Sequence, residues 1–339
     1  MSARRAVRIA CAVRGACAVI LLAVLVRRAI AEEGAAASAD TASSAAKVFS
    51  AAAAGDDVLV QANPVAPGGD DPATVWARLP RYRHEGVSRV RLSLALTGVG
   101  IYDVAFYETL KKPWWSGQKS DFHVINDWWG AYAMEVDKFA HAYAGQCMTR
   151  IAAQAYGWTG MTRRQALFWG GVTSLATLTQ VELLDGFTAK YGFSTADYAA
   201  NIAGAFLPLA QDIWQPLQLV TFKMSYHTAR FEKGTAPNLL EDYNRQTYWL
   251  TLDVNGLLPR PARRYWPDWL QVAAGCGVNH AFEANREREY YLALDVDPTR
   301  LPLGDGPLAS FLAPFHYLHL PAPAIRFRGD GTKLFALYF

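Results

Sequence analysis

Residues 182–204 read ELLDGFTAKYGFSTADYAANIAG, and this stretch contains the end of one helix and the start of the next. Asp185-Gly186 is typical of a helix end followed by a turn. Ser194 and Asp197 are spaced as in a capping box, in which a hydroxyl and a carboxylate bind free N–H groups at a helix start. The stretch therefore predicts two consecutive helices joined by a short connection.

Polar side chains recur in pairs at spacings that place each pair on one helical face. The pairs, three or four residues apart, are Asp137 with His141, Glu182 with Asp185, and Asp197 with Asn201. All six lie within apolar segments, so we expect their polar groups to meet one another, a metal ion or water.

These six residues have three interpretations. The one we favour is a structural polar network in which Asp137 pairs with Lys138 or His141, because burying an unpaired polar group costs roughly 1–3 kcal/mol. A second is an acid/base site made by His141 with Glu182 or Asp185, whose pKa values burial would move toward neutrality. A third is a metal site with His141, Asp137, Glu182 and Asp185 as candidate ligands. None of the spacings is a specific signature, so the cofactor stays unknown.

Four apolar segments with helical patterning account for the middle of the chain, at about 91–110, 126–156, 165–184 and 195–209. They are apolar on most sides, which fits buried helices or helices that lie in or against a membrane. We therefore expect an α+β protein in which a bundle of about four helices precedes a β-rich C-terminal segment.

The C-terminal region consists of short runs rich in aromatic and branched residues, at 248–254, 270–278, 289–296 and 333–339. In the last run Phe335, Leu337 and Phe339 would share one face of a strand. Exported outer-membrane barrels commonly end in this way, although a terminal core or edge strand has the same pattern. In all, five or six candidate strands follow residue 241, fewer than the eight or so that a complete barrel needs. The β segment is expected to pack on the helices or to be embedded with them in the outer membrane.

The N-terminus has the pattern of a secretory signal, with a basic start, the apolar run Gly15–Val26 and small residues near Ala31. An uncleaved anchor is the alternative. Cys11 and Cys17 lie in no convincing lipobox, so we expect no lipidation. The expected domains are a signal peptide at 1–31, a flexible Ala/Gly/Pro-rich tether at 32–86, a helical domain at 87–240 and a β-rich segment at 241–339.

Charge and motifs exclude several classes of function. The 339-residue chain has a net charge of +3, but residues 1–31 contain six Arg and no acidic residue, so the rest carries −3. This balance gives no support for nucleic-acid binding. The sequence lacks HExxH, GxSxG, Walker and GxGxxG motifs, which argues against zincin proteases, α/β-hydrolases and nucleotide enzymes that carry them. Two cysteines, Cys147 and Cys276, remain after the signal and could pair in an oxidising compartment.

The motifs DKFAHAY at 137–143, ELLDG at 182–186, YGFSTAD at 191–197 and NIAG at 201–204 resemble the YfiM-like family of predicted periplasmic lipoproteins. More distantly, the helices that carry these motifs are similar to VanZ-like membrane proteins. The resemblance implies a cell-envelope location and a shared polar constellation, and it implies no known reaction.

We therefore expect a non-enzymatic, membrane-associated envelope protein, exported and facing the periplasm, with the outer membrane favoured over the inner. Membrane lipids or envelope proteins are the expected partners. The alternatives are a membrane-embedded hydrolase or transferase acting on a lipid or cell-wall precursor, and a transport component.

Overall fold

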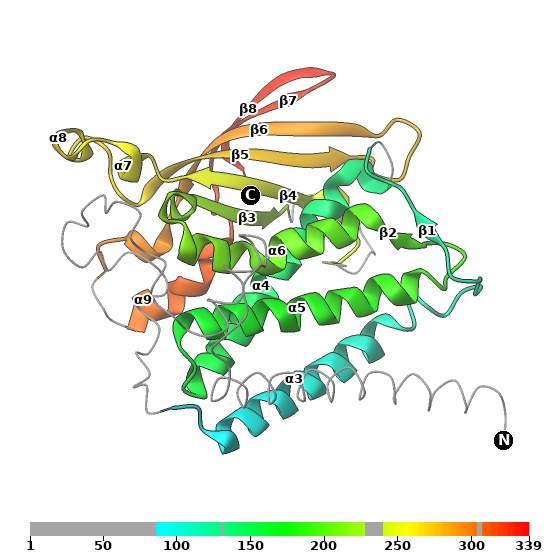
Figure 1. Cartoon of the computed structure of the whole chain (residues 1–339). Helices are drawn as coiled ribbons and strands as arrows, with labels where there is room; N and C mark the ends of the chain where they lie inside the picture. The colour runs from blue at the N-terminus through cyan, green and yellow to red at the C-terminus, as the bar shows by residue number, and fades with distance from the viewer. Residues whose placement is uncertain (1–85, 130–131, 228–239, 304–306, 339) are drawn as a thin grey trace, which may run out of the picture. The chain divides into compact units, whose positions relative to one another are not determined.

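The computed structural model describes residues 86–129, 132–227, 240–303 and 307–338. The expected signal peptide, and the tether up to residue 85, lie outside these ranges. The protein is α+β, with its long helices in the middle of the sequence and an antiparallel sheet at the C-terminal end (Figure 1). Its described residues divide into two compact units, which we call the helical unit (86–126 and 144–209) and the sheet unit (127–143 and 210–338).

Four long helices contribute to the helical unit: α3 (Arg89–Leu110), α4 (Val136–Trp158), α5 (Arg163–Asp185) and α6 (Thr195–Ile213). The first residues of α4 and the last residues of α6 belong to the sheet unit. Side-chain caps fix the helix starts. Thr162 and Gln165 form a reciprocal capping box at α5, and the Ser194 hydroxyl accepts a hydrogen bond from the Asp197 N–H at 3.0 Å at the start of α6.

The expectation of about four helices is wrong, because the described residues contain seven α-helices. The three additional helices are short and lie in the C-terminal part of the chain: α7 (Val254–Leu257), α8 (Arg260–Arg263) and α9 (Pro307–Leu312). Helices of one or two turns show no apolar period, which is why the sequence pattern missed them. The helix expected from residue 126 also starts later, since residues 132–135 form a 3-10 turn with positive φ at Ala133, Met134 and Glu135.

Close backbone contact joins α4, α5 and α6 in the helical unit. A Cβ built on Gly145 would lie 2.8 Å from the Ala205 nitrogen. The Gly145 carbonyl accepts a hydrogen bond from the Ser174 hydroxyl at 2.9 Å, and the Ala205 carbonyl accepts one from the Thr149 hydroxyl at 2.8 Å. Gly145 therefore sets the spacing between helices.

We expect Gly145→Ala to destabilise the protein by about 1–3 kcal/mol, because the added methyl group forces two helix backbones apart. Urea unfolding measures the change. The matched control is Gly98→Ala on α3, where nothing lies within 4 Å of the added Cβ. That change removes only the entropic cost of a helical glycine and is expected to stabilise by about 0.5–1 kcal/mol. Equal effects of the two substitutions would contradict the role of Gly145.

The sheet unit contains a six-stranded antiparallel sheet whose strands are ordered as they occur in the chain (Figure 1). Its strands are β3 (Val220–Tyr226), β4 (Gln246–Leu252), β5 (Leu270–Asn279), β6 (Glu287–Val296), β7 (Ala322–Arg328) and β8 (Gly331–Tyr338). A separate parallel pair in the helical unit joins β1 (Val124–Ile125) to β2 (Phe193–Ser194). The C-terminal segment is thus β-rich, as the sequence predicts.

Two strands differ from the expected pattern. β3 lies in a stretch expected to be helical, but α6 ends at Ile213 and the alternating residues that follow pair along the whole length of β4. In β8, Phe335 packs against the sheet's core while Leu337 is exposed. A register shift between Ala322 and Ala324 turns Tyr338 inward in place of Leu337. The predicted common face of Phe335 and Leu337 is therefore wrong, and Phe339 lies outside the described residues.

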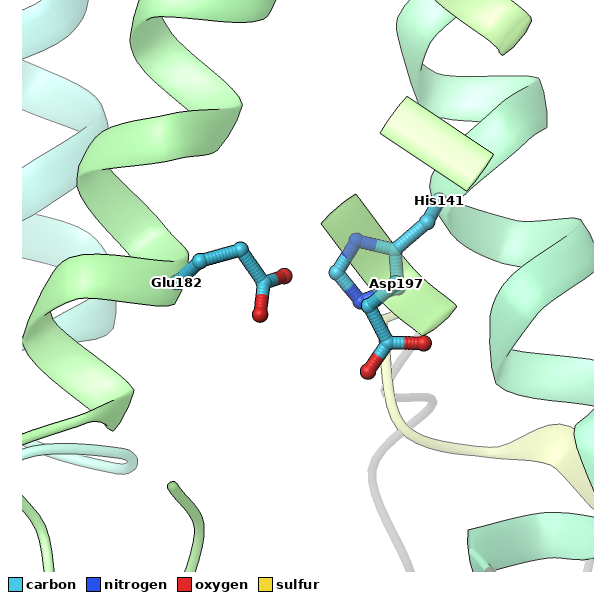
Figure 2. Close-up of side chains that lie close together, drawn as sticks. All are labelled: His141, Glu182 and Asp197. Atoms are coloured by element: carbon cyan, nitrogen blue, oxygen red, sulfur yellow. The ribbon is translucent and has the colours of Figure 1, made fainter. Parts of the chain in front are cut away.

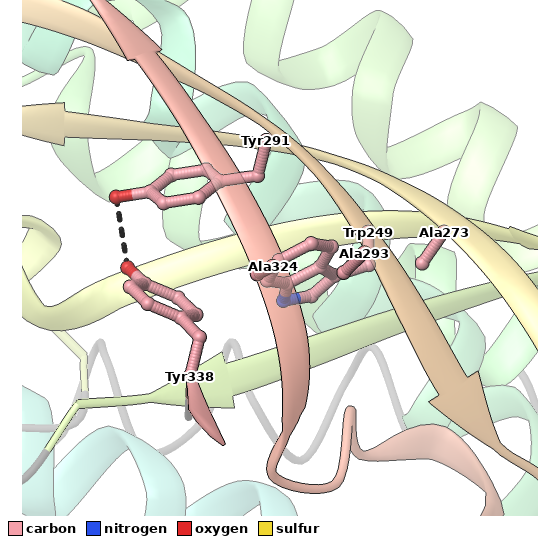
Figure 3. Close-up of a cluster of buried hydrophobic side chains, with 6 residues drawn as sticks. All are labelled: Trp249, Ala273, Tyr291, Ala293, Ala324 and Tyr338. Atoms are coloured by element: carbon pink, nitrogen blue, oxygen red, sulfur yellow. Dashed lines mark hydrogen bonds between the residues drawn. The ribbon is translucent and has the colours of Figure 1, made fainter. Parts of the chain in front are cut away.

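The core of the sheet unit lies on one face of the sheet (Figure 3). It is formed by Trp249, Ala273, Tyr291, Ala293, Ala324 and Tyr338. The Tyr338 hydroxyl donates to the Tyr291 hydroxyl at 2.8 Å, and the Tyr291 hydroxyl donates to Glu289 at 2.7 Å. Gly275 leaves room for the Trp249 ring, which a Cβ at that position would approach to 2.6 Å.

Candidate carboxylate site

Three carboxylates gather where α5 ends and α6 begins in the helical unit. Glu182 and Asp185 lie in the last turn of α5, and Asp197 lies in the first turn of α6. Figure 2 shows the Glu182 and Asp197 side chains, and a carboxylate oxygen of one lies within 4.8 Å of one of the other. The turn that the sequence predicts between these helices is what places the three acidic groups together.

Glu182 is the buried centre of this group, with 1% of its surface exposed. Its Oε2 accepts a hydrogen bond from the Ser194 N–H at 3.3 Å, and its Oε1 accepts one from the Asn201 amide at 3.4 Å. Asn201 lies one turn after Asp197 on α6 and is fully buried. The glutamate therefore ties the end of α5 to the start of α6.

Asp185 has a different environment. Its Oδ1 accepts a hydrogen bond from the Trp115 indole N–H at 2.6 Å. Its backbone carbonyl accepts bonds from the N–H groups of Thr188 and Gly192 at 2.9 and 3.0 Å. The Asp185-Gly186 sequence therefore ends α5 and organises the turn to β2, while the side chain binds the segment after α3.

Two of the three carboxyl groups, those of Glu182 and Asp185, resist ionisation. The pKa of Glu182 is raised to about 9, mainly by burial. The nearby charges of Asp197 and Asp185 also raise this pKa, and they outweigh the hydrogen bonds from Ser194 and Asn201, which lower it. Burial also raises the pKa of Asp185 to about 7, against the opposing effects of the Trp115 hydrogen bond and of Lys119 and Lys190. Two acids with such pKa values can hold or release a proton near neutral pH. Ionised carboxylates this close together can also hold a divalent cation.

Asp137 and His141 lie on the first two turns of α4, in the sheet unit. Lys138 binds Asp127, and its Nζ lies 3.1 Å from Asp137 Oδ2. His141 is half-buried one turn after Asp137. The structure thus brings Glu182, Asp185, Asp197 and Asn201 together in one unit, and in the other it pairs Asp137 with Lys138.

Two partners in these groups are not among the sequence candidates. Trp115 precedes Asp185 by 70 residues, and no spacing rule connects residues so far apart. Asp127 lies in a stretch that the sequence assigns to a helix. The one sequence signal for Asp127 as a site residue is an acidic side chain next to two tryptophans, at the start of an apolar segment.

The fold and the site define an α+β protein with a buried carboxylate cluster at a helix–turn–helix junction. Residues 126–210 match the model of a family described as predicted periplasmic lipoprotein (DUF2279). The matched region contains all six candidate site residues, and the similarity supports an exported, periplasm-facing location in the cell envelope. No curated protein and no solved structure matches the chain.

Proposed function

We propose that the chain is a non-enzymatic, membrane-associated protein of the cell envelope. The observation that carries this proposal is α3, which is long and apolar enough to cross a membrane by its length and composition. A helix of its 22 residues extends about 33 Å. Only 22% of its most apolar window is buried, so it differs from the buried core helix of a water-soluble protein.

The outward side of α3 carries exposed aliphatic residues, beside polar ones such as Arg91 and Thr97. Leu92, Ala95 and Leu96 are buried in the helical unit, whereas Ile101 is 66% exposed and Val90, Leu94 and Val104 are exposed as well. Exposed apolar surface of this kind marks a site of interaction with a partner or a membrane. In an exported protein the lipid bilayer is the apolar phase at hand, so α3 is the proposed membrane contact.

We assign the carboxylate cluster a structural role in this protein. Glu182 binds backbone and side-chain donors from the α6 start, and Asp185 binds Trp115, so each acid joins two segments of the helical unit. The resemblance to YfiM-like proteins fits a shared architectural constellation. The outer membrane is the proposed location.

The competing proposal is a hydrolase or transferase acting on a lipid or cell-wall precursor. It requires Glu182 and Asp197 to hold a metal ion or to exchange protons with a substrate. Stoichiometric metal in the purified protein, lost in Glu182→Gln and in Asp197→Asn, would favour it. A transport component would instead show flux in reconstituted vesicles that depends on Glu182 or Asp137.

The membrane proposal predicts that Ile101→Lys releases the protein from membranes. A lysine at the centre of a membrane-inserted helix costs about 2.5–3.5 kcal/mol, which lowers the membrane-bound to free ratio by more than about tenfold. Fractionation of cells into soluble, inner-membrane and outer-membrane pools measures this ratio and locates the protein.

The matched control is Ile151→Lys on α4, because Ile151 is 69% exposed and lies outside α3. The control is expected to fractionate like the unaltered protein. An equal release by both substitutions, or a soluble unaltered protein, would overturn the role of α3.

A further inference from the structure

We infer that the outward face of the sheet is a second lipid contact, which binds the acyl chains of a bilayer. This inference rests on the proposed membrane association and adds a surface in the other unit. The exposed large apolar and aromatic residues of this face, which we call the apolar sheet face, are Leu250, Leu252, Tyr290, Leu292, Leu294, Phe327 and Leu334.

Strand register places these residues side by side. Directly paired residues of neighbouring strands point to the same face of a sheet. One row across five strands consists of Leu250, Ala274, Leu292, Ile325 and Leu334. A second row consists of Leu252, Val272 and Leu294. Neither row contains a charged or hydrogen-bonding side chain, so the apolar sheet face is continuous.

The opposite face of the sheet carries the charges. Lys223 and Asp295 are fully buried there, 2.5 Å apart. Glu289, also buried, binds Arg326 and Arg328 at 3.1 and 3.2 Å. In an antiparallel sheet that faces water the buried face is apolar and the exposed face is polar. Here the buried face holds these charged groups beside the aromatic core of Trp249, Tyr291 and Tyr338, while the exposed face is apolar, as on strands whose outer face contacts lipid.

Residues along β6 follow the layers of a bilayer. On the apolar face Arg288, which binds Glu135, is followed by Tyr290 paired with Phe327, and then by Leu292 and Leu294. Aromatic rings suit the membrane interface, and aliphatic side chains suit the hydrocarbon. From Tyr290 to the strand end the chain rises about 20 Å, close to the apolar band of about 25 Å in membrane strands.

Lipid fits this face better than a protein partner does. A protein interface carries about one hydrogen bond per 100–200 Å², yet the two aliphatic rows offer no donor or acceptor, and the exposed hydroxyls of this face, on Tyr290 and Thr332, lie together in the row beside them. The part of the same face on β3 and β4 is covered within the sheet unit, where Phe139 and Tyr143 of α4 contact Phe222 and Tyr248. The remaining aliphatic rows require an apolar partner without donors or acceptors, which is the chemistry of acyl chains.

The experiment uses the full chain with its native cysteines replaced by serine and an environment-sensitive fluorophore on Leu292→Cys. Vesicles of phosphatidylethanolamine and phosphatidylglycerol are added, with or without bromine in their acyl chains. The matched control carries the fluorophore on Leu257→Cys in α7, because Leu257 is 55% exposed and lies outside the sheet. Co-flotation of protein with vesicles is measured in parallel, and circular dichroism verifies that each labelled chain is folded.

Brominated lipids are expected to quench the label at residue 292 and to leave the label at residue 257 unchanged. Leu292→Lys is expected to weaken vesicle binding by about tenfold or more, and Leu257→Lys to leave it unchanged. Co-flotation without quenching at residue 292 would overturn this inference and leave membrane association through α3 intact. Absence of co-flotation would overturn both proposals. A label at residue 292 that is shielded without lipid would instead show that protein, from the same or a second chain, covers the face.

Discussion

Replacing Glu182 by Gln is expected to remove much of the pH dependence of the protein's stability. The pKa of Glu182 is about 9 in the folded protein and close to its ordinary value of 4.5 in the unfolded chain. The folded state therefore holds one more proton between these two values, so stability is fully present below about pH 4.5 and falls as the pH rises toward 9. The slope for one such group is at most about 1.4 kcal/mol per pH unit.

The side chain introduced by Glu182→Gln has the shape of the protonated acid and no proton to lose. We expect this variant to match the unaltered protein at pH 5 and to be more stable by up to about 4 kcal/mol at pH 8, because at pH 8 the unfolded chain of the unaltered protein ionises this group and the folded state does not. Asp185, with its pKa raised to about 7, retains a smaller loss of stability between about pH 4 and 7 in both proteins. Urea unfolding at the two pH values gives the free energies.

Glu108→Gln on α3 is the control, because Glu108 forms an exposed pair with Lys111. It should change stability little at either pH. If the unaltered protein instead gains stability from pH 5 to pH 8, the structural role of the buried acid is wrong. Stabilisation of the unaltered protein at pH 8 by a divalent cation, absent in Glu182→Gln, would indicate a metal site in place of a structural network.

Local chemistry accounts for the parts of the fold that the sequence predicts. Arg89–Leu110, Arg163–Asp185 and the start of α6 follow the expected segments closely, since Thr162 and Ser194 are capping residues and Asp185-Gly186 ends a helix. These signals act within four residues of the chain. The short strands rich in aromatic and branched residues are predictable for the same reason.

Long-range packing decides what the sequence does not predict. The segment before α4 adopts positive φ at three successive residues, and Glu135 in that turn binds Arg288 of β6. Trp115 reaches Asp185 across 70 residues. The inward turn of Tyr338 depends on a register shift against β7. The sequence predicts which carboxylates share a helical face, from their spacing of three or four residues. The residues that bind them from other segments, such as Trp115, are set by the tertiary fold.

The second large effect is expected for Asp295→Asn in the sheet unit. Asp295 Oδ2 lies 2.5 Å from Lys223 Nζ and its Oδ1 lies 3.0 Å from His319 Nδ1, and all three side chains are fully buried. Although burial opposes ionisation, His319 and Lys223 keep the pKa of Asp295 below its ordinary value. Removing the negative charge leaves the Lys223 ammonium buried without its counter-ion, which costs about 3–5 kcal/mol.

Urea unfolding at pH 7 measures the free energy of unfolding lost in Asp295→Asn. Lys223→Met tests whether this loss comes from the lysine charge that is left buried without Asp295. The single Lys223→Met substitution leaves Asp295 with His319, whose ring stacks on Trp249 at a centroid distance of 3.9 Å. The double substitution Lys223→Met with Asp295→Asn removes both charges, so it should be more stable than Asp295→Asn alone by about 1–3 kcal/mol.

Glu283→Gln is the control for the loss of a carboxylate charge, since Glu283 is exposed and pairs with the exposed His280 at 3.0 Å. It should change stability by less than about 1 kcal/mol. If Asp295→Asn costs no more than Glu283→Gln, the buried pair of Lys223 and Asp295 does not stabilise the sheet unit. The buried charges of the sheet would then have no net stabilising effect, contrary to the expectation.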